Sequence, residues 1–335
     1  MPASPGALRF NTDSNKLELF DGNQWTEIVA SSPDSQTGGA RGVFGGGQSP
    51  STALNTIDYI TISTTGNAIS FGSLTQARQI GNSGGLSSST RGVFGAGYGN
   101  SPITFSNVID YVTISSTGNA ISFGNLTLAR FNHSSLSNST RGLWAGGLGP
   151  GNVDQNIIDY ITISSLGNAN DFGDLSIASN GGGALSSPTR GVFALGRAPA
   201  DTNIIEFVNI ASTGNSADFG DLTVATYSAG SCSNSVRGIF CGNNNPTGQN
   251  NIDYITIATL GNAIKFGDLT RSGNSFGGTS SSVRGVFAGG YSLAPTIVNT
   301  IDYVTIMSIG NAVDFGDLTQ VRRTLGACSN GHGGL

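Results

Sequence analysis

One sixteen-residue segment occurs six times along this chain of 335 residues. The first copy begins at Ile57 and reads IDYITISTTGNAISFG, and close variants begin at Ile109, Ile158, Ile205, Ile252 and Ile301. An Arg-Gly pair precedes each copy, and the steps between successive pairs are 50, 50, 49, 47 and 47 residues. Such a repeat predicts one structural unit built six times, with each unit burying its apolar face against its neighbours.

Each unit has the pattern of four short strands. In the second unit we expect strands at about residues 82–88, 91–97, 107–115 and 119–126. The third of these is rich in β-branched and aromatic residues, which favour strands. A Gly-Asn pair separates the third and fourth strands in every unit, and both residue types tolerate the positive φ of tight hairpins. No segment has a 3.6-residue period, so we expect almost no helix.

Three aromatic columns run through the repeat and predict its core. Burying each ring stabilises the fold by roughly 1.5–3 kcal/mol. The columns are Phe44, Phe94, Trp144, Phe193, Phe240 and Phe287; Tyr59, Tyr111, Tyr160, Phe207, Tyr254 and Tyr303; and Phe71, Phe123, Phe172, Phe219, Phe266 and Phe315.

The end of the chain favours a closed ring over an open β-solenoid. The C-terminal segment resembles the first-strand segment of the later units, whereas the first unit lacks a clear one. We therefore expect residues 325–331 to complete the first sheet, which would close the ring and remove its exposed edges. The first strand is rich in Gly and Ser, and its small side chains suit the crowded region nearest the axis.

A Gly-Gly pair follows the second strand in three units, at Gly45-Gly46, Gly146-Gly147 and Gly289-Gly290. Together with the repeat length, this pattern resembles kelch-like β-propellers. The resemblance implies an all-β fold, a six-bladed β-propeller of four-stranded blades closed by the C-terminal strand, over residues 33–335. The blades would start near Arg41, Arg91, Arg141, Arg190, Arg237 and Arg284.

Two charged columns accompany the repeat. One consists of the six arginines just named, and the other is acidic. We expect the columns to form ion pairs between strands or blades, because the planar guanidinium suits a partly buried carboxylate. The alternative is a ring of arginines around the axis that holds an anion. The acidic residues are Asp58, Asp110, Asp159, Glu206, Asp253 and Asp302.

Length varies most in the loop between the second and third strands, so these loops are candidates for a binding face. Loops on a rigid frame commonly carry recognition residues. The candidate contacts are Tyr98, Phe105, Arg197 and Tyr291. The alternative is that these loops differ because nothing constrains them.

Residues 1–32 lie outside the repeat. Their alternating pattern predicts a small β-meander with turns at NTDSN and DGN, too small to be stable without a partner surface. The segment GALRFNTDSNKLELFDGNQW resembles a short module of bacteriophage tail-fibre and other virion proteins. The resemblance implies attachment to other virion proteins, an oligomer in the particle, and localisation on a virion assembled in the host cytoplasm. The alternative is a hairpin that caps the propeller.

Composition excludes several other classes. A net charge of -5 argues against nucleic-acid binding, and no apolar run is long enough for membrane insertion. We interpret Cys232, Cys241 and Cys328 as buried thiols, and His133 and His332 as polar loop residues. The sequence contains no recognisable catalytic constellation, and we expect no metal and no cofactor.

These observations favour a non-enzymatic phage virion structural protein, a tail fibre or surface adhesin, whose loop face binds host glycan or envelope. One alternative is a purely architectural capsid or tail decoration protein. Another is a propeller glycoside hydrolase, which predicts an axial pocket with clustered Arg, Tyr and Glu residues.

Overall fold

The computed structural model describes residues 4–11, 16–27, 39–81, 84–100, 103–243, 249–292 and 296–335. The chain divides into two compact units, Met1–Thr37 and Gly38–Leu335. The predicted boundary at residue 32 falls outside the described residues. Almost all regular structure in the described ranges is antiparallel strand, and the one helical segment there is the 3-10 turn Pro150–Asn152. The expectation of an all-β chain is confirmed.

The N-terminal unit is a three-stranded meander of β1 (Leu8–Asn11), β2 (Lys16–Phe20) and β3 (Trp25–Glu27). Arg9 pairs with Glu18 at 2.8 Å and stacks 4.2 Å above the Trp25 ring. The DGN turn forms because Asp21 accepts hydrogen bonds from two following backbone amides, which also lower the pKa of its carboxyl. The other predicted turn, NTDSN, falls largely outside the described residues.

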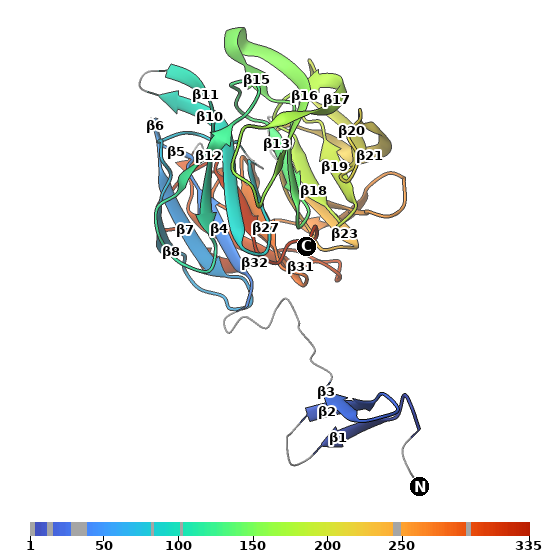
Figure 1. Ribbon diagram of the computed structural model, residues 1–335. Coiled ribbons are helices and arrows are strands. Elements are labelled where there is room, and N and C mark those ends of the chain that lie inside the picture. Colours follow the sequence, from blue (N-terminus) through green and yellow to red (C-terminus); the bar gives the residue numbers. More distant parts are fainter. Residues whose placement is uncertain are drawn as a thin grey trace. The chain divides into compact units, whose positions relative to one another are not determined.

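The described residues of the second unit form six large antiparallel sheets, numbered here as sheets 1 to 6 in chain order (Figure 1), and two small ones in the loops. Each large sheet has four main strands, and sheet 3 has a fifth short one. From the inner strand outward, sheet 1 is β33 (Gly326–Ser329), β4 (Arg41–Gly45), β7 (Thr56–Thr61) and β8 (Ile69–Ser73). Sheet 2 is β9 (Gly85–Ser87), β10 (Arg91–Asn100), β11 (Ile103–Thr113) and β12 (Ile121–Asn125). Sheet 3 is β13 (Ser134–Ser137), β14 (Arg141–Ala145), β16 (Val153–Thr162) and β17 (Asn170–Ser179), with β15 (Leu148–Gly149) also on β16.

Sheets 4 to 6 repeat the same order, so the four-strand reading of the repeat is confirmed. Sheet 4 is β18 (Gly183–Ser186), β19 (Arg190–Ala194), β20 (Thr202–Asn209) and β21 (Ala217–Thr226). Sheet 5 is β22 (Gly230–Ser233), β23 (Arg237–Asn243), β24 (Gln249–Thr256) and β25 (Ile264–Asp268). Sheet 6 is β27 (Gly277–Ser280), β28 (Arg284–Ala288), β31 (Thr300–Thr305) and β32 (Val313–Asp317).

The last strand of the chain completes the first sheet. β33 pairs antiparallel with β4, and Cys328 lies opposite Val43. The prediction that residues 325–331 supply the missing strand of the first repeat is therefore confirmed. The Asn330 side chain, directly after β33, also connects the two strands, because its Oδ1 accepts a hydrogen bond from the Arg41 amide at 2.8 Å.

The apolar core lies between neighbouring sheets. Six buried clusters fill the contacts between successive sheets, and one of them joins sheet 6 to sheet 1 through Phe315, Val286 and Phe44. The first and third aromatic columns are buried as expected. The second aromatic column is half-buried. Each of its rings packs edge-on against a ring of the third column and also contacts an arginine guanidinium.

A ring of serine hydroxyl groups connects the six inner strands. Each strand ends in a buried serine whose Oγ donates a hydrogen bond to the backbone carbonyl of the corresponding serine in the preceding sheet. Ser87 Oγ closes the series by donating to the Ser329 carbonyl at 2.6 Å. The residues are Ser87, Ser137, Ser186, Ser233, Ser280 and Ser329. Each sheet is thus fixed to the next at its inner edge.

The expected pairing of the arginine column with the acidic column is wrong. Arg41 lies opposite Thr61 in the sheet, whereas Asp58 lies opposite Phe44. The Arg41 guanidinium instead donates to the Ile114 carbonyl of sheet 2 at 3.0 Å and stacks 4.9 Å from the centre of the Tyr59 ring. The other five arginines make the same two contacts, and Arg284 of sheet 6 reaches Ile62 of sheet 1. The column joins neighbouring sheets.

The Gly-Asn pairs also join neighbouring sheets. The glycines adopt positive φ in five of the six turns, but none of the asparagines does. Each asparagine Oδ1 accepts a backbone hydrogen bond from the fourth strand of the preceding sheet, as Asn168 does from Asn125 at 3.0 Å. The fourth strand carries a glycine at the contact because a Cβ on Gly124 would lie 2.1 Å from the Gly167 carbonyl oxygen.

We expect Gly124→Ala to destabilise the whole unit Gly38–Leu335 by about 1–3 kcal/mol, because the new methyl group meets backbone that cannot move aside. Gly118→Ala is the matched control, since a Cβ there meets no atom within 4 Å. Urea unfolding of both variants measures the difference. Equal midpoints for the two variants would show that the sheets do not approach this closely.

Candidate functional site

The acidic column is buried between the sheets. Each carboxylate accepts a hydrogen bond from the hydroxyl of a Thr or Ser that directly follows the fourth-strand Leu of the preceding sheet. In sheet 2, Asp110 accepts from Thr75 Oγ1 at 2.6 Å and from the Thr75 amide at 3.1 Å. These acids therefore have a structural role, and the residues that bind them were not identified from the sequence.

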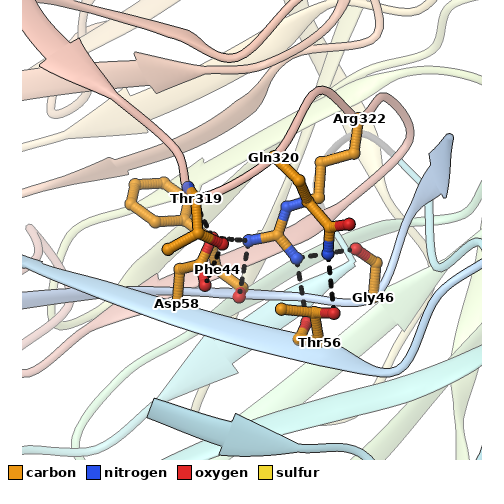
Figure 2. Close-up of polar contacts among 7 residues, drawn as sticks. All are labelled: Phe44, Gly46, Thr56, Asp58, Thr319, Gln320 and Arg322. Atoms are coloured by element: carbon orange, nitrogen blue, oxygen red, sulfur yellow. Dashed lines mark hydrogen bonds and ion pairs between the residues drawn. The ribbon is translucent and has the colours of Figure 1, made fainter. Parts of the chain in front are cut away.

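In four sheets a second arginine completes this cluster. Figure 2 shows it in sheet 1, where Arg322 contacts Asp58 at 2.9 Å and donates to the carbonyls of Phe44, Gly46 and Thr56. Arg78 and Asp110 form the same pair in sheet 2, and Arg130 and Asp159 form it in sheet 3. In sheet 6 the partner of Asp302 is Arg271, two positions earlier along its connector. Burial lowers the pKa of these arginines, and the adjacent carboxylates oppose that shift.

Sheets 4 and 5 have a buried acid without a basic partner in any described contact. Ser179 and Thr226 stand where the connectors to sheets 1, 2 and 3 have the arginine. Glu206 is held by the hydroxyls of Ser176 and Ser216, and Asp253 by Thr223 and Asn251.

An axial cavity of about 50 Å³ lies inside the six inner strands. It is lined by the serine ring, by the residues flanking those serines, and by His332. Neither the arginine column nor any Tyr or Glu lines it, so it differs from the anion-binding ring and from the hydrolase pocket considered above. His332 lies at one end, where its Nε2 is 3.1 Å from the Ser87 carbonyl oxygen.

Both histidines lie in loops, as predicted, but neither is exposed. His133 is buried, and its Nε2 donates to the Gly95 carbonyl at 2.9 Å. Desolvation and the nearby charges of Arg130 and Arg78 lower the pKa of His133 to about 3. His332 is half-buried, and desolvation lowers its pKa to about 4. The three cysteines are buried free thiols, as expected, and burial raises the pKa of Cys328 to about 12.

We expect stability to fall by about 2 kcal/mol between pH 7 and pH 5 through His133. The unfolded chain binds a proton near pH 6.5, whereas the folded chain keeps this imidazole neutral until about pH 3. The contribution is therefore complete above the unfolded pKa and declines as the pH falls. Urea unfolding at several pH values measures it, and His133→Gln should remove that part of the slope. If the free energy of unfolding of His133→Gln depends on pH as steeply as that of the unaltered protein, other groups cause the pH dependence.

The loop face consists here of the segments between the second and third strands together with the connectors that follow the fourth strands. These loops form small strands of their own: β5 (Gln48–Ser49) pairs with β6 (Thr52–Ala53), and β26 (Gly273–Asn274) pairs with β29 (Tyr291–Ser292), which also pairs with β30 (Thr296–Ile297). β10 and β11 continue to Asn100 and Ile103, so this hairpin projects from the molecule (Figure 1).

The four candidate contacts lie on this face but belong to three separate groups. Tyr98 and Phe105 pack edge-on with ring centres 5.3 Å apart, and Tyr98 also contacts Phe131. Arg197 is exposed, and its guanidinium lies 5.7 Å from the Tyr227 ring centre. Tyr291 is half-buried, with Arg323 5.1 Å from its ring centre.

The connectors contribute residues to this face that were not predicted from the sequence. Phe131, Tyr227 and Arg323 occupy one repeat position in the second, fourth and sixth connectors, each directly after the buried-arginine position. Backbone bridges hold the connectors to the loops at Gln79–Tyr98, Phe131–Leu148, Asn180–Arg197 and Gln48–Arg323. Four connectors also have a non-glycine residue at positive φ, at Asn132, Ser228, Ser275 and Thr324. Such strained positions persist only where the surroundings fix the backbone.

Comparison of the chain with models of known protein families and with curated proteins finds no match. Among the described residues, no three His, Cys, Asp or Glu side chains gather into a group that could hold a metal ion. The same residues include no helix of the length and apolarity needed to cross a bilayer.

Proposed function

We propose that the six sheets are the blades of a closed six-bladed β-propeller. The serine ring supports this, because its hydrogen bonds return from Ser329 to Ser87. The pairing of β33 with β4 and the apolar cluster between sheets 6 and 1 also support it.

A single cysteine substitution tests the closure in solution. Val43→Cys would place a thiol opposite Cys328, within the Cα separation that a disulfide requires. Mild oxidation should then change the mobility of the denatured chain on a non-reducing gel, and reduction should reverse the change. No change on oxidation would contradict the closed arrangement.

We infer that the loop face binds a surface outside this chain and that the protein is a phage virion component, a tail fibre or surface adhesin. The observation that carries this is the clustering of aromatic and arginine side chains, partly exposed, on loops that backbone bridges hold in place. Aromatic rings and guanidinium groups are common in recognition surfaces because they bring large contact area with few rotatable bonds. Host glycan or envelope is the proposed ligand class.

The N-terminal unit is proposed to attach the protein to other virion subunits. This rests on the resemblance of residues 6–25 to the virion module and on two exposed apolar side chains of β1, Leu8 and Phe10, which are 60% and 58% exposed. Residues two apart on a strand share a face, so these side chains present one apolar strip.

A panel of bacterial surface glycans, probed with the full chain and with loop variants, tests the binding function. We expect Tyr98→Ala and Arg197→Ala to weaken binding tenfold or more, as is usual for central contact residues. Leu260→Ser is the control, because Leu260 is exposed in the turn before β25, at the opposite end of its sheet. Binding that Leu260→Ser abolishes and the loop variants spare would contradict the loop face as the site.

The alternative of an architectural decoration protein predicts binding to virion subunits and to no glycan. Imaging of the native particle distinguishes the two, because a decoration protein would have its loop face covered by neighbouring subunits.

A further inference from the structure

Sheet 5 has an unfilled position where sheets 1, 2 and 3 have a buried guanidinium. Asp253 is 3% exposed, and no arginine or lysine contacts it in the described structure. Thr226 occupies the same repeat position as Arg322, because each lies four residues after the corresponding Leu, Leu222 or Leu318. The buried charge therefore lacks the partner that its equivalents have.

A small cavity occupies the place of the missing guanidinium. In sheet 1 the carbonyls of Phe44, Gly46 and Thr56 receive the Arg322 N–H groups. The residues of sheet 5 that correspond to Phe44, Gly46 and Thr56 all line the cavity, together with Asp253 and Thr226. Those equivalents are Phe240, Gly242 and Asn251. The cavity has a volume of about 10 Å³, which is room for one particle of the size of a water molecule.

A buried hydroxyl group that lines this cavity has no protein partner. Thr226 is 9% exposed, and its Oγ1 makes no hydrogen bond within the described structure. Asp253 Oδ1 accepts hydrogen bonds from Thr223 Oγ1 at 2.8 Å and from Asn251 Nδ2 at 2.7 Å, and Oδ2 accepts from the Thr223 amide at 2.9 Å. Neutral donors therefore orient the carboxylate, and no cationic side chain contacts it in the described structure. The polar residues that line the cavity are Asp253, Thr226 and Asn251, beside apolar side chains such as Leu222 and Phe240. Carboxylate, hydroxyl and carbonyl oxygens are the ligands that suit a hard cation.

We propose that this cavity binds one monovalent cation of the size of sodium, potassium or ammonium, held by Asp253 and Thr226. One carboxylate is too few for a divalent ion, which in proteins usually has several acidic ligands. The related cavity near sheet 4 does not include Glu206 among its lining residues, and Glu206 already accepts from two serine hydroxyls. The site is therefore specific to sheet 5.

Thermal unfolding of the full chain tests the site. In about 0.1 M chloride salts of equal ionic strength, sodium, potassium or ammonium should raise Tm by about 2–4 °C relative to tetramethylammonium, which the cavity cannot hold. Asp253→Asn should abolish this difference. Thr226→Arg should also abolish it, and should raise Tm in tetramethylammonium, because it restores the pair present in sheet 3.

Two further variants keep the test decisive if Thr226→Arg does not fold. Thr226→Met fills the cavity without a charge and should remove the cation effect. Arg130→Thr removes the guanidinium beside Asp159 and so creates a second site of the same kind. It should enlarge the rise in Tm that the small cations cause. No difference between the small cations and tetramethylammonium in the unaltered protein would mean that water alone occupies the cavity. A difference that Asp253→Asn preserves would place the cation elsewhere, and either result would overturn the proposal.

Discussion

Removal of the last strand should unfold the second unit. A chain that ends at Leu325 lacks β33, and we expect it to lose more than about 5 kcal/mol, which is comparable to the whole stability of many domains. The deletion exposes the edge of β4, removes Ala327 and Cys328 from two apolar clusters, and breaks the serine ring at Ser329. Circular dichroism and limited proteolysis would report the loss of the cooperative transition.

Two companion chains separate the strand from other effects of truncation. Deletion of residues 331–335 alone removes the segment after β33 and should preserve a cooperative transition. In a permuted chain, residues 318–330 would stand between the N-terminal unit and Gly39, and the chain would end at Asp317. β33 would then be connected to β4 directly and no longer to β32. We expect this chain to recover most of the stability. A truncated chain as stable as the full one would contradict the role assigned to β33.

Replacement of Arg130 by Ala should destabilise the second unit by about 3–5 kcal/mol. Arg130 and Asp159 are both fully buried at 3.2 Å, and the Arg130 guanidinium also donates to the Trp144 carbonyl. Loss of the guanidinium leaves a buried carboxylate without its charge partner, with only the donors of Thr127 beside it. The midpoint of urea unfolding at an unchanged m-value measures the cost.

An exposed ion pair in the same unit provides the control. Lys265 and Asp268 lie 3.0 Å apart with their side chains 58% and 33% exposed. Lys265→Ala should change stability by less than about 1 kcal/mol, because water solvates both charges. The double variant Arg130→Ala, Asp159→Asn should be more stable than Arg130→Ala alone. Equal effects of the Arg130 and Lys265 substitutions would show that the Arg130 pair is also solvated.

The repeat made much of this fold predictable. The period and the unmatched first unit together placed Cys328 beside Val43, because a strand position left empty at one end of the chain was filled at the other. The aromatic columns predicted the core, because apolar rings that recur at a fixed spacing are expected to be buried together. The length of each strand depended on local pairing, and β10 and β11 extend beyond the predicted limits.

The polar contacts were less predictable because spacing alone does not determine which side chains face each other. The arginine and acidic columns seemed suited to pair, but the register separates Arg41 and Asp58 by three positions along the sheet. The true partner, Arg322, belongs to a position that only three connectors share, so no six-fold column marked it. The serine of each inner strand was visible as a column, but its size had suggested packing and not a hydrogen-bonded ring.

The pairing of β4 with β33 has a consequence for synthesis of the protein. A ribosome makes β4 almost three hundred residues before β33, so sheet 1 stays incomplete until β33 has been synthesised. Closing so long a loop in an unfolded chain carries an entropic penalty of about 5 kcal/mol, which the folding of the intervening sheets reduces by bringing its ends together. The nascent chain must therefore carry an open, adhesive edge on β4 throughout elongation, and a stalled or prematurely terminated product would be prone to aggregate.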